Sequence, residues 1–279
     1  MPRFTTSDGL SLYYEDEGEG LPILCLSGLT RNVRDFDHVA PQLLAGHRMI
    51  RMDYRGRGQS DYAPDPMSYT LRREAQDALE LMDHLGIAQF ALLGTSRGGL
   101  IGMGLAATAK NRLLGVALND IGPVLDAEGL TAIMGYLGIQ PTFADLDAMA
   151  AARQVAMEAQ FPGVPLSRWR QEVATTHVQT AEGVALNYDP KLRDAIIAAG
   201  AEGGVELWPF FEAIAPLPCA VIHGANSDLL RHATVDEMQR RMPDLRVAHV
   251  ADRAHIPFLD EPEAKALLAN WLNDLQKAS

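Results

Sequence analysis

The chain has 279 residues, of which 47% are hydrophobic and 22% are charged, and its formal net charge is −12. This length fits one large domain or two small ones, and the apolar content is enough to build a buried core, which argues against disorder. The negative charge excludes a nucleic-acid binder that works through a basic face and disfavours adsorption to an anionic membrane. The two cysteines, Cys25 and Cys219, lie in apolar runs and are too few for a disulfide framework, so we expect free buried thiols.

No stretch near the N-terminus resembles a signal peptide, and the longest charge-free apolar run, residues 98–109, is too short to span a bilayer. We therefore expect a soluble, cytoplasmic protein without a nucleic-acid or membrane partner. We expect its partner to be a small-molecule substrate, and we expect neither a cofactor nor a metal ion. The sequence leaves the oligomeric state open.

The first part of the chain alternates between predicted strands and helices. An Asp-Gly turn at residues 8–9 predicts a hairpin that joins strands at 3–6 and 10–15. Further strands are predicted at 22–26, 48–53, 90–93 and 113–118, and helices at 35–46, 70–86 and 98–109. Strands that are apolar throughout and alternate with helices are typical of a parallel sheet with helices on both faces.

This alternation stops near residue 120 and resumes at residue 218. The intervening residues have amphipathic helical patterns at 126–138, 142–160 and 166–180, without a convincing strand. After them come strands at 218–223 and 245–250 and helices at 234–242 and 263–277. Because a structureless loop of this length is uncommon in a compact domain, we predict one α/β core, residues 1–121 and 209–279, with an inserted helical cap, or lid, at 122–208.

The strongest motif is Gly94-Thr95-Ser96-Arg97-Gly98, a G-x-S-x-G pattern between a predicted strand and a predicted helix. Such a sharp turn exposes the serine hydroxyl, and its small residues let the backbone pass close to itself. The start of the helix also supplies unpaired N–H groups near the hydroxyl. We interpret Ser96 as a nucleophile.

A serine nucleophile needs a base, and the base needs a carboxylate that orients it. His255 follows the last predicted strand, in a loop where parallel sheets commonly place their sites, and we assign it as the base. Asp228, which follows the strand at 218–223, is the predicted acid, and the chain order Ser, Asp, His supports it. Asp120, which follows the strand at 113–118, is the alternative acid.

A negatively charged reaction intermediate needs two positioned donors. We expect these donors to be the backbone N–H groups of Arg97, next after the nucleophile, and of Leu29, in the loop after the strand at 22–26.

With these motifs, nearly the whole chain resembles the α/β-hydrolase superfamily. Ser27-Gly28-Leu29 stands where that family usually has His-Gly-x, residues 53–60 resemble its D-x-R-G-x-G-x-S loop, and residues 255–262 resemble its H-x-P-x-x-x-E-P ending. The resemblance implies an α/β-hydrolase fold, with Ser96, Asp228 and His255 as the triad and with Leu29 and Arg97 as the oxyanion hole. We interpret the loop at 53–60 as structural, with Arg55 paired inside the protein.

Within this superfamily, haloalkane dehalogenases and epoxide hydrolases use an aspartate nucleophile, so Ser96 argues against both. Ring-fission C–C hydrolases often have Trp after the catalytic His, where this chain has Ile256. The expected reaction is therefore hydrolysis of a small carboxylic ester, lactone or thioester through an acyl-enzyme. C–C bond hydrolysis, cofactor-free perhydrolysis and ligand sensing with slow turnover stay as alternatives.

Arg31, Arg34 and Arg97 lie near the predicted oxyanion loop and the nucleophile in an otherwise acidic chain. One hypothesis is that Arg31 attracts a substrate carboxylate, and the favoured alternative is that these arginines pair with neighbours such as Asp35. Trp208 lies where the lid rejoins the core, either in the pocket wall or in hinge packing.

Overall fold

The computed structural model describes residues 1–201 and 205–278, and eight of its strands form one sheet in the order β1-β2-β4-β3-β5-β6-β9-β10. Strands β1 and β2 and strands β2 and β4 pair antiparallel, and all other neighbours pair parallel. The predicted mostly parallel sheet is confirmed, as is the hairpin that opens the chain. The strands are β1 (Arg3–Thr5), β2 (Ser11–Gly18), β3 (Leu21–Leu26), β4 (His47–Met52), β5 (Phe90–Thr95), β6 (Leu113–Asn119), β9 (Cys219–Gly224) and β10 (Arg246–Val250).

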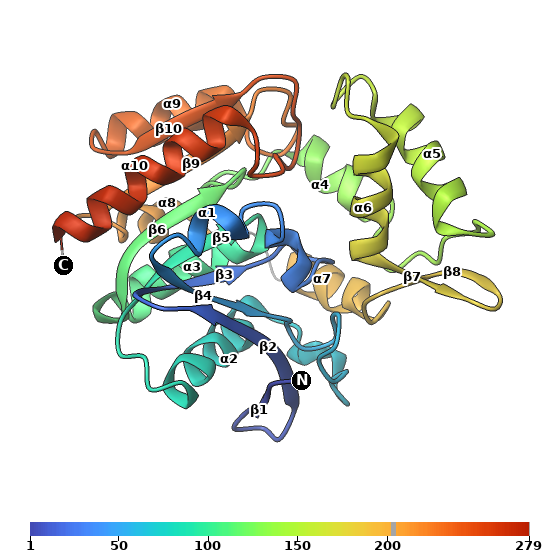
Figure 1. Cartoon of the computed structure of the whole chain (residues 1–279), viewed down its shortest axis with the longest axis horizontal. Helices are drawn as coiled ribbons and strands as arrows, with labels where there is room; N and C mark the ends of the chain where they lie inside the picture. The colour runs from blue at the N-terminus through green and yellow to red at the C-terminus, as the bar shows by residue number, and fades with distance from the viewer. Residues whose placement is uncertain (202–204, 279) are drawn as a thin grey trace.

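Helices pack on both faces of this sheet (Figure 1). They are α1 (Ala40–Leu43), α2 (Leu71–His84), α3 (Arg97–Thr108), α8 (Trp208–Glu212), α9 (His232–Arg241) and α10 (Pro262–Ala278). The helix predicted at 35–46 is wrong, because a 3-10 turn at Val33–Phe36 and the short α1 take its place. Pro41, near the start of α1, lacks the amide hydrogen that a longer helix would need there. Within the described residues, every helix is too short or too polar to cross a bilayer.

The two faces of the sheet bury different side chains, because neighbouring residues of a strand point in opposite directions. In β3, Leu24 and Leu26 belong to the core cluster that includes α2 and α3. Ile23 and Cys25 belong to the cluster that includes α1 and α10. Cys25 and Cys219 are free and buried as predicted, and burial raises the pKa of both thiols to about 12.

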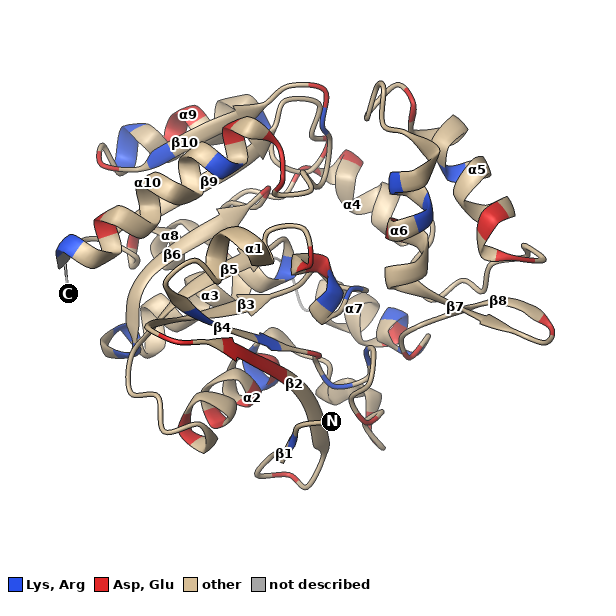
Figure 2. Ribbon diagram, viewed as in Figure 1, with Lys and Arg blue, Asp and Glu red and all other residues tan. Residues whose placement is uncertain are grey.

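The antiparallel edge of the sheet differs from its apolar centre. The acidic stretch of β2 runs beside basic residues of β4 (Figure 2). Arg48 contacts Asp16 at 2.7 Å, and Arg51 contacts Glu15 at 2.6 Å and Asp37 at 2.8 Å. Pairs of opposite charge on neighbouring strands favour this register over one in which like charges would meet.

Between β6 and α8 the chain forms a separate group of elements, which lies beside the sheet in Figure 1. The elements are α4 (Ala127–Met134), α5 (Leu146–Met157), α6 (Leu166–Thr176), β7 (His177–Thr180), β8 (Gly183–Leu186) and α7 (Leu192–Ala201). The expectation of no strand in this segment is wrong, since β7 and β8 form an antiparallel hairpin. The predicted helix at 166–180 ends at Thr176. In the turn from β7 to β8, Gly183 adopts a φ of 129°, a conformation that residues with a side chain rarely adopt.

The packing of α3 against β3 depends on one glycine. A Cβ at Gly98 would lie 2.0 Å from the carbonyl oxygen of Leu26, which is backbone and cannot move aside. Gly104 lies on the same helix, and a Cβ there would meet nothing within 4 Å.

This contrast predicts opposite effects for two identical substitutions. Gly98→Ala should lower the free energy of unfolding by about 2 kcal/mol or more, because the added carbon overlaps backbone atoms. Gly104→Ala should raise it by up to about 1 kcal/mol, because alanine is the better helix former. Urea denaturation measures both. A Gly98→Ala protein as stable as Gly104→Ala would contradict the close approach of β3 and α3.

Candidate active site

Ser96 occupies the sharp turn between β5 and α3. Its φ of 49° lies in the left-handed region, and its N–H donates to the carbonyl of Asn119 at 3.0 Å. A Cβ at Gly94 would lie 2.4 Å from the backbone of Gly98, so a larger residue at Gly94 would prevent this turn. The strained turn predicted by the motif is confirmed, and it leaves the Ser96 hydroxyl facing a cavity.

Three side chains from three loops form a continuous chain of hydrogen bonds. The Ser96 hydroxyl lies 3.0 Å from Nε2 of His255, and Nδ1 of His255 lies 2.8 Å from Oδ2 of Asp120. With the His255 proton on Nδ1, that N–H donates to the carboxylate, and Nε2 accepts from the serine hydroxyl. The predicted pairing of Ser96 with His255 is therefore present.

The predicted pairing of His255 with Asp228 is wrong, because Asp120 makes this contact. Asp120 directly follows β6, which lies between β5 and β9, so the acid comes from the strand next to that of the nucleophile. Asp228 lies four residues beyond the end of β9, and its carbonyl accepts from the N–H of Gly129. Its side chain lines the cavity instead.

The Asp120 carboxylate is fully buried and held by three donors. Oδ1 accepts from the N–H of Gly224 at 2.7 Å, and Oδ2 accepts from the Ser227 hydroxyl at 2.6 Å and from His255. Asp120 itself adopts a φ of 51° directly after β6. These hydrogen bonds hold the carboxylate in place and aim it at the imidazole.

The two predicted oxyanion donors lie in the loops next to Ser96. A Cβ built on Gly28 would lie 3.9 Å from Cβ of Ser96, so the loop that carries Leu29 passes beside the nucleophile. Across residues 1–201 and 205–278, the N–H groups of Leu29 and Arg97 have no hydrogen-bond acceptor. Unpaired N–H groups beside a serine hydroxyl are the donors that a tetrahedral oxyanion requires.

A buried carboxylate, not foreseen from the sequence, ties these two loops together. Glu74 contacts Nε of Arg97 at 2.5 Å and Nη1 of Arg57 at 2.8 Å, and Arg57 donates to the carbonyl of Leu29 at 3.0 Å. Burial alone would raise the pKa of Glu74, but the two guanidinium charges outweigh it and lower that pKa. The available signal was the position of Glu74 on the apolar face of α2, four residues before Ala78.

The loop at 53–60 is internally paired, as predicted. Arg55 is fully buried and contacts Asp77 at 2.6 Å and Asp8 at 2.9 Å. The Asp53 carboxylate accepts from the N–H groups of Val33 and Gln59 at 2.7 and 2.8 Å.

A cavity of about 580 Å³ lies in front of Ser96, between the core and the segment from α4 to β8. Arg31 lines it, but its guanidinium contacts Asp35 at 2.5 Å and Glu172 at 2.6 Å. The contact with Asp35 is the internal pairing that the sequence favoured. Although burial opposes this, the two carboxylates raise the pKa of Arg31. The structure therefore argues against Arg31 as a free anion-binding residue.

The other predicted pocket residues point elsewhere. Trp208 lies outside the residues that line this cavity and packs against Phe211 and under Arg241, whose guanidinium is 3.9 Å from the ring centre. Arg34 donates to the carbonyl of Ala174, and the Arg97 side chain points to Glu74. Trp208 is therefore not part of the cavity wall.

One arginine that the sequence analysis did not single out does face the cavity. Arg153, on α5, is half-buried, and among the described residues it has neither an ion pair nor a hydrogen bond. Burial lowers the pKa of Arg153 and outweighs Tyr136 and Glu172, which raise it, so the pKa lies below its ordinary value. The signal was present in the sequence, since Arg153 is the single basic residue within the alanine-rich α5.

His177, at the start of β7, also lines the cavity, and it is buried. Burial and the positive charge of Arg153 lower the pKa of its imidazole to about 4. The ring is therefore neutral near pH 7, and it leaves the charge of Arg153 uncompensated from this side.

Comparisons with known proteins identify the family of the chain. Residues 22–262 match the family model described as the alpha/beta hydrolase fold. The chain is 36% identical over 253 residues to a 3-hydroxybutyrate-oligomer hydrolase from Cupriavidus necator, covering 88% of this chain and 86% of the relative. The chain therefore belongs to the α/β-hydrolase fold family.

Two further likenesses extend over nearly the whole chain. The crystal structure of an alpha/beta hydrolase from Novosphingobium aromaticivorans has a TM-score of 0.91 and 38% identity, covering 98% of this chain and 97% of the other. A rhodomycin D methylesterase from Streptomyces peucetius is 28% identical and covers 97% of this chain and 98% of the relative. The protein is thus an α/β-fold hydrolase with ester-cleaving relatives.

The lowered pKa of His177 predicts a contribution to acid sensitivity. Between its unfolded pKa of 6.5 and its folded pKa of about 4, the unfolded chain binds a proton that the folded protein does not. Stability from this residue is fully present above pH 6.5 and is lost as the pH falls through that window, by on the order of 1 kcal/mol per pH unit. Urea unfolding across this range should show a shallower pH dependence for His177→Gln than for the unaltered protein. An equal slope for both would contradict the neutral, buried state of His177, and His84→Gln, at an exposed position, is the control.

Proposed function

We propose that the protein hydrolyses a carboxylic ester through an acyl-enzyme, with Ser96 as nucleophile, His255 as general base and Asp120 as the acid that orients it. The observation that carries the proposal is the continuous Asp120–His255–Ser96 chain at 2.8 and 3.0 Å. Serine becomes a useful nucleophile only when a base accepts its proton, and this arrangement supplies that base.

The reaction then follows from the positions of the donors. His255 Nε2 takes the Ser96 proton as the hydroxyl attacks the ester carbonyl, and the Leu29 and Arg97 N–H groups stabilise the oxyanion. The protonated His255 gives its proton to the departing alcohol, which leaves an acyl group on Ser96. A water molecule, activated by His255, attacks this acyl group and releases the carboxylic acid.

We propose that residues 122–208 act as a lid over this site. Their small core includes Phe161 and Trp169, and both rings pack against Phe258, three residues after His255, with ring centres 5.7 and 6.3 Å away. The lid therefore rests on the loop that carries the base, and it supplies much of the cavity wall. A covered site excludes water and strengthens the electrostatic interactions inside it.

We propose that the substrate is an ester of a short hydroxy acid with a free carboxylate, held by Arg153. Among the residues that the structure describes, Arg153 is the guanidinium of the cavity wall that has no partner. Guanidinium groups bind carboxylates through two parallel hydrogen bonds. The Cupriavidus necator relative, named as acting on 3-hydroxybutyrate oligomers, supports this class, because such oligomers carry both an ester bond and a terminal carboxylate. The Ser96 hydroxyl would attack the carbonyl of an ester, a lactone or a thioester in the same way. We favour an ester because the free carboxylate of a hydroxy-acid ester would pair with Arg153.

The choice of acid predicts a clear difference between two variants. Asp120→Asn should lower kcat by about 10⁴-fold, because the amide cannot stabilise the protonated imidazole of His255. Asp228→Asn should stay within about 10-fold of the unaltered enzyme, since Asp228 is not in contact with His255. Initial rates on p-nitrophenyl butyrate measure both, and circular dichroism checks that each variant is folded.

Ser96→Ala sets the baseline and should lose about 10⁴- to 10⁶-fold in kcat. A large loss for Asp228→Asn with near-normal Asp120→Asn would contradict the proposed acid.

A ligand sensor with a slow triad would release one equivalent of p-nitrophenol and then stop. Continuous turnover contradicts that alternative. Ring-fission dienones and peracid formation, assayed beside the esters, test the C–C hydrolase and perhydrolase alternatives.

Recognition of a carboxylate by Arg153 predicts a selective loss. Arg153→Gln should lower kcat/KM for the 3-hydroxybutyrate dimer by about 10- to 100-fold, mainly through KM, because one charge-assisted contact is removed. The methyl ester of the same dimer lacks the carboxylate charge and should lose little.

Arg170→Gln is the matched control, because Arg170 is an exposed lid arginine that pairs with Asp147. It should leave both substrates unchanged. Equal losses of Arg153→Gln on the free acid and the methyl ester would contradict carboxylate recognition while leaving the proposed triad intact.

A further inference from the structure

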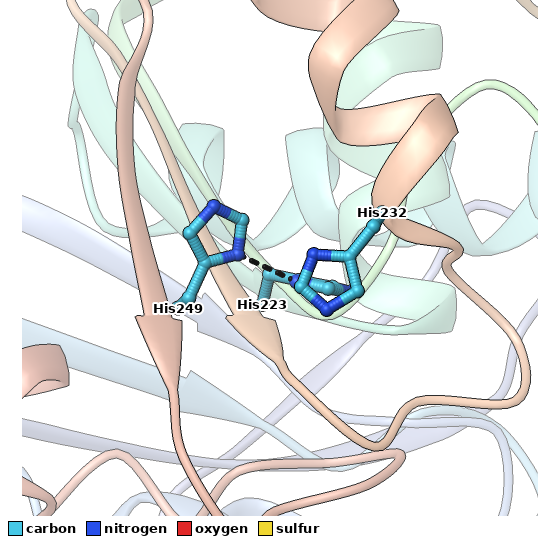
Figure 3. A group of neighbouring side chains, drawn as sticks. All are labelled: His223, His232 and His249. Carbon is cyan, nitrogen blue, oxygen red and sulfur yellow. Dashed lines mark hydrogen bonds between the residues drawn. The ribbon is translucent and has the colours of Figure 1, made fainter.

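Three histidines come together from elements that are separated in the sequence (Figure 3). His223 is in β9, His232 is the first residue of α9 and His249 is in β10. One ring nitrogen from each lies within 4.8 Å of the others, and the ring centres are 4.5 to 5.1 Å apart. His223 is fully buried, whereas His232 and His249 are exposed, so the group opens to solvent.

The hydrogen bonds of two rings leave their Nδ1 atoms available. Nε2 of His223 lies 2.8 Å from the carbonyl of Leu230, and Nε2 of His232 lies 3.2 Å from the carbonyl of Ala225. A carbonyl can only accept, so both Nε2 atoms carry the proton and both Nδ1 atoms carry a lone pair. A backbone carbonyl on the far nitrogen is also the usual partner of a histidine that binds a metal, because it fixes the ring.

The third ring completes the set. Nδ1 of His249 lies 2.9 Å from Nδ1 of His223, so in the absence of an ion one proton is shared by these two nitrogens (Figure 3). Moving the proton of His249 to its own Nε2, on an exposed ring, frees a third lone pair without a change of charge. An ion at the usual Zn–N distance of about 2.0–2.1 Å needs nitrogens about 3.3 Å apart, and the three ring nitrogens lie within 4.8 Å of one another before any ion is bound.

We propose that His223, His232 and His249 form a binding site for a divalent transition-metal ion of the zinc type. Three neutral imidazoles favour Zn²⁺, Co²⁺, Ni²⁺ or Cu²⁺ and disfavour Mg²⁺ and Ca²⁺, which prefer oxygen ligands. Water takes the fourth position, and Asp236, one turn after His232 on α9, acts on the His249 ring with its negative charge.

The ion would act as a clip on the loop at 225–231. His223 precedes this loop and His232 follows it, so one ion joins both of its ends to β10. The loop carries Ser227, which donates to Asp120, and Asp228, which lines the cavity. Gly224, next to His223, is the backbone donor to Asp120. The role of the ion is therefore structural, and it steadies the surroundings of the candidate acid without contact with substrate.

The test uses the full chain without a histidine tag, freed of metal with a chelator that is then removed. Calorimetric titration with Zn²⁺ near pH 7.5 should show one ion per chain. The unfolding temperature should rise with Zn²⁺ and stay unchanged with Mg²⁺. Co²⁺ should give the intense visible absorption of a tetrahedral site, which is a readout independent of activity.

His232→Gln and His249→Gln change exposed rings, so both variants are expected to fold. Each should weaken Zn²⁺ binding by more than about 10-fold, and the double variant should abolish the rise in unfolding temperature. His84→Gln, an exposed histidine outside the group, should bind within about twofold of the unaltered chain. The proposal is overturned if the unaltered chain binds no stoichiometric Zn²⁺. It is equally overturned if the double variant binds as tightly, which would locate the ion elsewhere, such as at His255.

Discussion

The candidate active site depends on the hydrogen bonds made where β6 ends. The backbone carbonyl of Asn119 accepts from the N–H of Ser96. The side-chain amide of Asn119 donates to the carbonyl of Pro257, two residues after His255. The next residue, Asp120, donates its N–H to Ile222 in β9. One strand end therefore holds the loops of the nucleophile, the base and the acid in register, because parallel strands bring their carboxyl ends to the same edge of the sheet.

Buried charge adds a second set of constraints on the other side of Ser96. Glu74 lies between Arg57 and Arg97, and through them it contacts the carbonyl of Leu29 and the start of α3. An isolated charge in this position would be costly, and removal of one partner would leave the others uncompensated. The arrangement therefore stabilises one geometry of the two N–H groups that face the nucleophile.

In the cavity wall, by contrast, some charged side chains have ion-pair partners and others do not. Arg31 is neutralised by Asp35 and Glu172, whereas Arg153 and Asp228 lack ion-pair partners in the described part of the chain. A charged side chain of a cavity wall that has no protein partner is a candidate for contact with a ligand. This contrast, more than the total charge of −12, bears on which substrate fits.

The sequence by itself determined the features that depend on a few neighbouring residues. The glycines around Ser96 predicted the turn, apolar runs predicted the parallel sheet, and the loop after the last strand identified His255. The hairpin of β7 and β8 was missed because His177–Thr180 continues an amphipathic pattern that could extend a helix. The helix predicted at 35–46 was wrong because Pro41 allows only the short α1 there, after a separate 3-10 turn at Val33–Phe36.

Only the tertiary structure decided which distant groups meet. Asp120 and Asp228 both follow strands, and their local sequences do not state that β6 lies between β5 and β9. The same holds for Glu74 and for the three histidines, whose partners come from other elements, and for Arg153, whose place in the cavity wall depends on the packing of the segment from α4 to β8. Local steric preferences act over a few residues and can be read along the chain, whereas contacts between loops depend on strand order and packing, which arise only when the whole sheet has formed.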